Sequence, residues 1–148
     1  MNLDKTDVKI MKTLLSNSRF SAREISRHAG VSVGTVLARI KAMENERIIK
    51  AYSAMFDHEK LGYELTIVTE ITVSKGKLLE TDREVAKMSG VCAVYDVTGE
   101  SDAIVVAKFK TRKELSEFTK SLLAMPYIER TNTHVVLTTV KEDFRLAP

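Results

Sequence analysis

The sequence of 148 residues is long enough for one ordinary domain or two small ones, and its 44% hydrophobic and 29% charged residues are typical of a globular protein. It has no apolar run near the roughly 20 residues that a transmembrane helix needs, and because its first ten residues include no apolar segment we expect no secretory signal. The single cysteine, Cys92, excludes an internal disulfide, and three scattered histidines offer no zinc spacing, so we expect a cytoplasmic protein without metal or cofactor.

The charge is unevenly distributed along the chain. The net charge is +3, but residues 1–50 hold ten Lys/Arg and five Asp/Glu, a net +5, whereas residues 51–148 hold thirteen and fifteen, a net −2. Chance variation can produce such a difference, but a basic first third joined to a slightly acidic remainder favours two modules with different partners.

Three helices are predicted in residues 1–50. Asp4 and Asp7 have the spacing of an N-cap and an acidic third helical residue. Ser21 and Glu24 form a capping box that opens the second helix, which Gly30 is expected to end in the left-handed conformation. The apolar stripe of the first helix consists of Val8, Ile10, Met11, Leu14 and Leu15.

The third helix, which Ser32 caps, is predicted to have two unlike faces. The face expected to pack inside the module consists of Val33, Val36, Leu37, Ile40 and Met43. The opposite face consists of Gly34, Thr35, Ala38, Arg39 and Ala42. Two short helices joined by a turn with glycine, and covered by the first helix, predict a helix-turn-helix.

This outer face carries mostly small side chains, which suits a helix that enters the major groove of DNA. Gly34 permits close approach, Thr35 can bond a phosphate or a base edge, and Arg39 can read guanine or hold a phosphate. Arg27 is also placed to line the DNA backbone. For any single residue a solvated surface is the simpler explanation, but the whole arrangement favours DNA binding. The predicted DNA-binding residues are Arg19, Ser21, Arg23, Ser32, Gly34, Thr35, Arg39 and Lys41.

Residues 51–62 are predicted to be an extended hinge that can pair with another subunit, and residues 63–148 a second domain. The expected order of strands and helices, βαββαβ, predicts an α+β ferredoxin-like domain in which two helices cover one face of a four-stranded antiparallel sheet. Apolar residues on the other face predict that two sheets pack together in a homodimer. The elements are a strand over 64–75, a helix ending at Gly90, a strand over 91–99, a strand over 103–109, a helix opened by Thr111 and Glu114, and a strand over 128–141.

On the second of these strands, Val91, Ala93, Tyr95 and Val97 are expected to share one face. The turn that follows, residues 98–102, can hold the head group of an α-amino acid: backbone N–H groups around Gly99 suit a carboxylate, and Asp102 suits an ammonium group. A plain hairpin turn explains the same residues more simply. The sequence contains no catalytic constellation, so we expect no enzyme. The candidate effector residues are Tyr95, Thr98, Gly99, Glu100, Ser101, Asp102, Thr131 and Thr133.

Three segments together resemble the Lrp/AsnC, or feast/famine, transcriptional regulators: "LDKTDVKIMKTL", "SRFSAREISRHAGVSVGTVLARIKAMENERIIKAY" and "TGESDAIV". The resemblance covers essentially the whole chain. It implies an N-terminal winged or simple helix-turn-helix and a C-terminal ferredoxin-like ligand-sensing domain. It also implies dimers that bind double-stranded DNA, assemble further, often to octamers, and respond to amino acids bound between dimers.

Carried over to this sequence, the resemblance makes residues 33–46 the recognition helix, with Ser32, Gly34, Thr35 and Arg39 at DNA. It makes residues 99–102 the effector loop, with Thr131 and Thr133 contributed by the facing subunit. The family often has a larger or aromatic residue just before the loop aspartate, where this chain has Ser101. The loop therefore has more room, and the effector of other members cannot be transferred to it.

Two alternatives remain. A nucleoid-type architectural protein would bind DNA with weak sequence discrimination and without an effector. A tetrapyrrole decarboxylase branch resembles the same fold, with catalytic histidine and basic residues in the second domain. In this chain His134 is the one histidine in the βαββαβ region, and the helix-turn-helix keeps its basic face, which argues against that enzyme.

Overall fold

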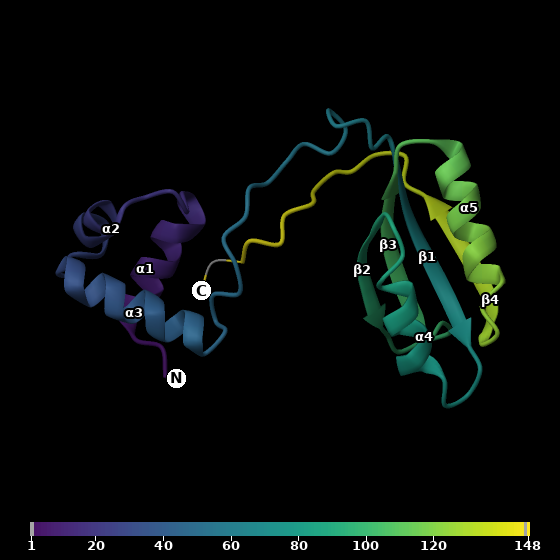
Figure 1. Cartoon of the computed structure of the whole chain (residues 1–148), viewed down its shortest axis with the longest axis horizontal. Helices are drawn as coiled ribbons and strands as arrows, with labels where there is room; N and C mark the ends of the chain where they lie inside the picture. Colours follow the sequence, from purple (N-terminus) through teal and green to yellow (C-terminus); the bar gives the residue numbers. More distant parts are fainter. Residues whose placement is uncertain (1, 147) are drawn as a thin grey trace. The chain divides into compact units, whose positions relative to one another are not determined.

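The computed structural model describes residues 2–146 and 148, which form two compact units (Figure 1). The first unit extends to Met55 and also includes the C-terminal segment that begins at Lys141, and the second unit is Phe56–Val140. The second domain was instead predicted to extend over residues 63–148. Among the described residues, no helix is both long and apolar enough to cross a membrane.

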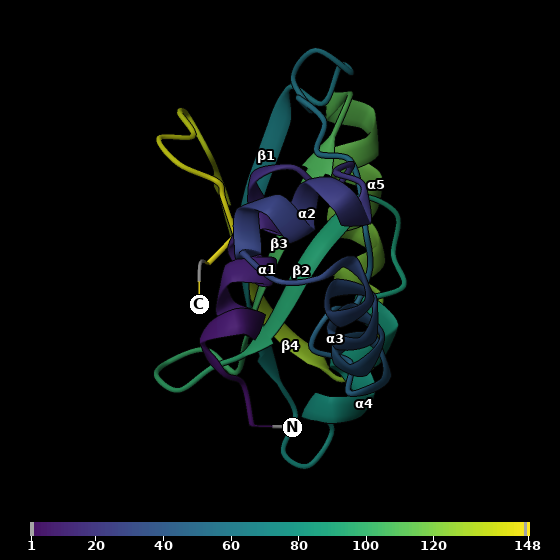
Figure 2. The same cartoon turned by 90° about the vertical axis from the view of Figure 1, so that its left-hand side faces the viewer.

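Helices α1 (Lys5–Ser16), α2 (Ala22–Ala29) and α3 (Val33–Asn45) make up the regular structure of the first unit (Figure 2). The predicted caps are confirmed. The Asp4–Asp7 and Ser21–Glu24 capping boxes both form, and Gly30 ends α2 with a φ of 72°. The buried core of the unit consists of Ile10, Ile25, Ala29, Val36 and Met43.

The face of α3 that packs inside the unit is narrower than predicted. Val36 and Met43 are fully buried and Ile40 packs against them, but 37% of Val33 and 55% of Leu37 is exposed. The prediction that these last two residues dock the helix is therefore wrong. In a three-helix unit of this size, α1 and α2 cover only a strip along α3.

The second unit is a four-stranded antiparallel sheet in the order β2-β3-β1-β4, with two helices on one face (Figure 1). The core lies between the helices and the sheet, where alternate residues of β1 and β3, such as Ile67, Ile71 and Val105, are buried. This is the predicted α+β, ferredoxin-like plan. The elements are β1 (Leu65–Val73), α4 (Leu78–Val85), β2 (Val91–Asp96), β3 (Ala103–Phe109), α5 (Arg112–Leu123) and β4 (Ile128–Val135).

Two details of the strands differ from the prediction. The pairing of β2 with β3 shifts between Val91 and Ala93, so these two residues lie on opposite faces, and Ala93 and Tyr95 share the face without helices. The last strand ends at Val135 instead of residue 141: its register with β1 ends at the pair Ile67 and Val135, followed by one hydrogen bond of 2.9 Å from the Val136 N–H to the Thr66 carbonyl, close to the start of β1 at Leu65.

Gly90 marks a close approach between β2 and β3. Its φ is +83°, and a Cβ built there would lie 2.7 Å from both the carbonyl oxygen of Lys108 and the Cε1 of Phe109. Only glycine combines this conformation with this contact. The residue therefore fixes the start of β2 against the neighbouring strand.

Candidate nucleic-acid interface and effector loop

The first turn of α3 is open to solvent and offers backbone N–H groups. The Ser32 hydroxyl accepts the N–H of Thr35 at 3.1 Å and shares a hydrogen bond of 2.9 Å with the Thr35 hydroxyl. Gly34 is exposed, and an added Cβ would meet only the Ser32 hydroxyl, at 3.8 Å. Nothing inside the fold requires glycine there, so its small size matters only to a molecule that approaches from outside.

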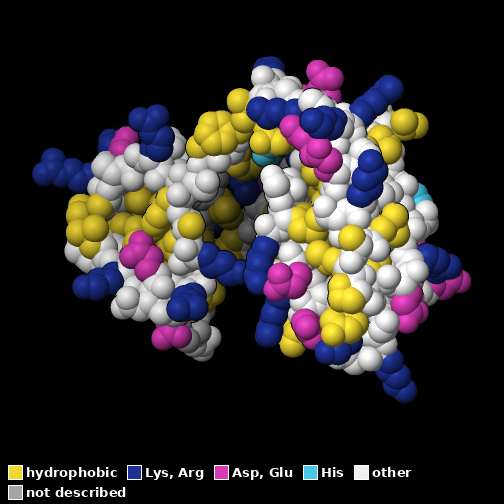
Figure 3. Space-filling model, turned by 45° about the vertical axis from the view of Figure 1, so that its right-hand side comes forward, with side chains coloured by type: hydrophobic (Ala, Val, Ile, Leu, Met, Phe, Trp, Pro, Cys, Tyr) yellow, Lys and Arg dark blue, Asp and Glu magenta, His cyan; other side chains and the backbone are white. Residues whose placement is uncertain are grey.

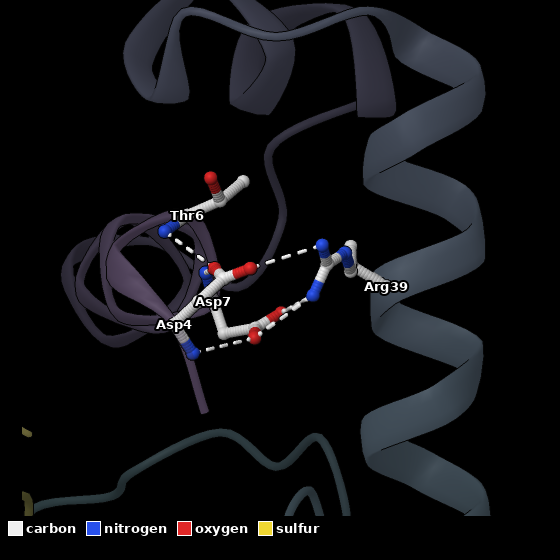
Figure 4. A network of polar contacts seen from close by, with 4 residues as sticks. All are labelled: Asp4, Thr6, Asp7 and Arg39. Carbon is white, nitrogen blue, oxygen red and sulfur yellow. Dashed lines mark hydrogen bonds and ion pairs between the residues drawn. The ribbon is translucent and has the colours of Figure 1, made fainter. Parts of the chain in front are cut away.

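Arg39, predicted to contact DNA, instead points toward α1 (Figure 4). Its Nη1 lies 3.1 Å from Oδ2 of Asp7, whose side chain is fully buried, and its Nη2 lies 3.0 Å from Oδ2 of Asp4. The Asp7 carboxylate also accepts the N–H of Asp4 at 3.0 Å. A guanidinium held by two carboxylates is occupied, so this geometry does not support Arg39 as a residue that reads bases.

The same network sets the ionisation of the N-cap. The backbone N–H groups of Asp7 and Thr6 donate to the Asp4 carboxylate, and these bonds, with help from the Arg39 guanidinium, hold the pKa of Asp4 below its ordinary value. Asp4 is thus ionised at neutral pH and keeps its attraction for both the helix N-terminus and Arg39.

The other predicted DNA-binding side chains are mostly on the surface. Arg19, Arg23 and Lys41 are exposed, as is Arg27. The Ser21 hydroxyl is already bonded to Glu24, at 2.7 Å from its Oε2, as part of the capping box. Figure 3 shows lysine and arginine side chains that project from the surfaces of both units. Exposed cations of this kind suit phosphate contacts, whereas the Ser21 hydroxyl caps the start of its own helix.

Two hydrogen bonds of Asp102 hold the predicted effector loop against β1. Its carboxylate Oδ2 accepts the N–H of Val73 at 2.8 Å, and its own N–H donates to the carbonyl of Ile71 at 2.9 Å. Gly99, with a φ of +131°, makes the turn possible. Asp102 therefore has a structural role in the free chain, alongside any attraction that its charge has for a ligand.

Beside the loop, a polar network lies on the face of the sheet without helices. Glu70 accepts a hydrogen bond from the Ser101 hydroxyl at 3.0 Å, and its other carboxylate oxygen lies 3.1 Å from Nε2 of His134. These two interactions, with the Ser101 bond the larger cause, lower the pKa of Glu70. Glu70 was not among the predicted site residues, although a carboxylate inside the apolar strand "TIVTEITV" is a signal for such a role.

A shallow pocket brings part of the predicted effector set together. Carboxylates surround it, which favours a cationic group, and Ile104 supplies an apolar wall. Tyr95 is opposite Ile104 in the strand pairing and half-exposed. The residues that line the pocket are Glu70, Asp96, Val97, Thr98, Glu100, Ser101 and Ile104.

Thr131 and Thr133 do not line this pocket. They pair with Ile71 and Thr69 on the helix-covered side of the sheet, and the hydroxyls of Thr133 and Thr69 share a hydrogen bond of 3.0 Å. Within one chain the sheet thus lies between their side chains and this pocket. Their predicted role, as residues donated by a facing subunit, stays a prediction.

Helix α4 carries another carboxyl group, that of Asp82, within electrostatic range of Asp96 and Asp102. Burial, followed by repulsion from Asp96 and Asp102, raises the pKa of Asp82. Its Oδ1 is buried without a hydrogen-bond partner among the described residues. Even so, no group of histidine, cysteine and acidic side chains in the described part of the chain has the arrangement of a metal site.

Comparison with known proteins defines the class. Residues 3–50 match a family model described as winged helix-turn-helix DNA-binding, and residues 66–146 match the Lrp/AsnC ligand binding domain. The described residues of the first unit contain no strand, so the helices alone represent that motif here. With the fold above, the two matches define a transcriptional regulator with a DNA-binding unit and a ligand-binding unit.

The chain belongs to the Lrp/AsnC family of transcriptional regulators. It is 47% identical over 148 residues to the uncharacterised HTH-type transcriptional regulator PH1692 of Pyrococcus horikoshii, with 100% of both chains covered. It is 34% identical over 144 residues to the regulator FL11 of the same organism, covering 97% of this chain and 95% of the relative. The crystal structure of the regulator NMB0573 of Neisseria meningitidis with L-Met has a TM-score of 0.88 and 28% identity, covering 98% and 96%.

Proposed function

We propose that this regulator binds a specific DNA sequence and that a small effector, an amino acid, changes its assembly and its affinity for DNA. It acts as a homodimer that assembles further, to an octamer in the fullest form, inside the cytoplasm. The observation that carries this proposal is the presence, in one chain, of an open helix N-terminus on a basic unit and of a carboxylate-lined pocket at the loop of a ligand-binding unit.

The DNA half of the proposal depends on α3. Its first turn presents N–H groups and the positive end of the helix dipole to a phosphate, and Gly34 lets that phosphate come close. The exposed cations Arg19, Arg23 and Lys41 add contacts that do not depend on sequence. In a two-fold dimer, the two recognition helices would lie about 34 Å apart, or a multiple of that, on a pseudo-palindrome.

The effector half depends on the charge and shape of the pocket. Glu70, Asp96 and Glu100 line it, and we place the ammonium group at the loop carboxylate Asp102, next to Ser101, with these three carboxylates adding to the negative field. N–H groups around Gly99 suit a carboxylate. The L-Met bound by the Neisseria relative supports an α-amino acid as the ligand class. Ser101 leaves space beside this site, so the side chain of the effector need not be that of methionine.

A screen of the common amino acids by thermal shift, followed by calorimetry and size-exclusion chromatography, tests the effector. We expect one amino acid to raise the unfolding temperature and change the oligomer. Asp102→Asn keeps an oxygen for the Val73 N–H but removes the charge, whereas Asp102→Ala removes both. Loss of ligand heat in both variants supports the charge role. Heat retained in Asp102→Asn would move the ammonium site to other carboxylates.

Selection of duplexes from a randomised pool, followed by mobility-shift titration, tests the DNA half. Lys41→Ala is expected to weaken binding to every duplex, because a phosphate contact carries no sequence information. Lys113→Ala, at an exposed position of α5 in the other unit, is the matched control. If the chain binds the duplexes but enriches no sequence among them, it is an architectural DNA binder and the proposed specificity is wrong.

A further inference from the structure

The exposed side of the recognition helix is apolar. Leu37 is 55% exposed and Val33 is 37% exposed, and the adjoining residues Gly34 and Ala38 are exposed as well. With Lys41, these residues have the spacing i, i+1, i+4, i+5 and i+8, which places them on one side of a helix. We call these five residues the outer strip of α3.

A single exposed leucine on a protein surface needs no explanation. Here the leucine lies in the middle of the helix that would enter the groove. Arg39, the one guanidinium on α3, is turned away into contact with Asp4 and Asp7. The outer strip therefore offers methyl groups and one ammonium, and it lacks the bidentate donors that usually read guanine.

The major groove of DNA has one apolar landmark, the C5-methyl group of thymine, which alanine and other apolar side chains contact. The surroundings of the strip favour DNA over a protein as the occupant, since residues 1–50 carry a net charge of +5 and Lys41 lies within the strip itself. A hydrophobic protein partner would gain nothing from that charge.

We propose that Leu37, together with Val33 and Ala38, selects sequence by packing on thymine methyl groups in the major groove. This inference rests on the proposed function, namely that the first unit binds DNA. It makes Leu37 a specificity-determining residue, while Arg39 positions the helix from behind. Sites rich in thymine at the positions under α3 are the class of DNA that such a surface recognises.

Deoxyuridine, which is thymidine without the methyl group, provides the test. The probe is the duplex most enriched by the wild-type chain from a randomised pool, with each thymine replaced in turn by uracil. For the wild type, each contacted methyl should be worth about fourfold in Kd, the equivalent of about 0.8 kcal/mol for one buried methylene. Leu37→Ala should bind the thymine probe more weakly and lose most of the response to uracil at the same positions.

Leu37→Ala should fold normally, because the residue is exposed and alanine favours helix, and an unchanged unfolding midpoint checks this. Leu79→Ala, at a 64% exposed leucine on α4, is the control and should keep the full response to uracil. If Leu37→Ala keeps the wild-type response, or loses self-association instead of DNA affinity, the inference is overturned. A wild type that binds no duplex at all would instead refute the proposed function.

Discussion

The ion pairs between α3 and α1 lead to a prediction about stability. Arg39→Met keeps an unbranched apolar stem but removes the guanidinium that bonds Asp7 at 3.1 Å and Asp4 at 3.0 Å. Asp7 is then a fully buried carboxylate whose remaining hydrogen bond comes from the Asp4 N–H at 3.0 Å. A carboxylate in that position has lost most of the interactions that offset the cost of burying a charge.

The loss in free energy of unfolding expected for Arg39→Met lies between two limits. Breaking a fully buried ion pair costs about 3–5 kcal/mol, whereas an exposed pair contributes about 0–1 kcal/mol. Asp7 is at the first limit, but the Arg39 side chain is 37% exposed, so water can enter and solvate part of the vacated site. We therefore expect a loss of about 2 kcal/mol, which for a unit of this size lowers the unfolding midpoint by about 10 °C.

Thermal unfolding followed by the helical circular dichroism signal measures this effect. Asp7→Asn combined with Arg39→Met should recover about 1 kcal/mol, because the double variant leaves no buried charge. Lys113→Ala, which breaks an exposed pair with Glu117 on α5, should change little. An Arg39→Met chain that unfolds at the wild-type midpoint but no longer binds DNA would refute the reasoning and return Arg39 to the DNA surface.

Three further predictions concern single residues. Ser32→Ala removes the oxygen that accepts the Thr35 N–H, and we expect about 1 kcal/mol less stability in urea unfolding; an unchanged midpoint would mean that water caps α3 equally well. Gly90→Ala should cost more than about 2 kcal/mol in the same assay, because its Cβ would lie 2.7 Å from Lys108 O at a φ of +83°; a stable variant would contradict this packing. Burial, with help from its hydrogen bond to Glu44, raises the pKa of Tyr52 to about 12 from 10.0, so its stabilising effect is complete below pH 10.0 and is lost as the pH rises through about 12. Ultraviolet titration should find one tyrosine that ionises at higher pH than the others, and Glu44→Gln should lower its pKa only in part. If all four tyrosines ionise together, the raised pKa of Tyr52 is excluded.

Local patterns in the sequence predicted most of the fold. Helix starts such as Asp4 and Ser21 depend on side chains within three residues, and the left-handed end at Gly30 depends on one. Strand alternation on β1 likewise needs only the neighbouring residues. Such features depend on residues that are close together in the sequence, so the sequence alone is enough to predict them.

The features that could not be predicted depend on contacts between distant segments. Whether Leu37 is covered depends on how far α1 and α2 reach along α3, and the direction of Arg39 depends on a carboxylate 32 positions earlier. The shift in pairing at Cys92 depends on the register of β3. In the same way, the network around Glu70 required the pairing of β1 with β4 before His134 could be placed beside it.

Because Asp7 is buried, ionic strength should affect its ion pair with Arg39 much less than the contacts between surface cations and DNA. Dissolved salt weakens contacts between exposed cations and phosphates, because binding releases counterions from the DNA, and it screens buried ion pairs much less. Surface residues such as Arg23 and Lys41 should therefore release DNA as salt rises, while the link from Arg39 to Asp7 persists. Changes in the ionic composition around the protein would then alter how long it stays on DNA without altering the shape of α3.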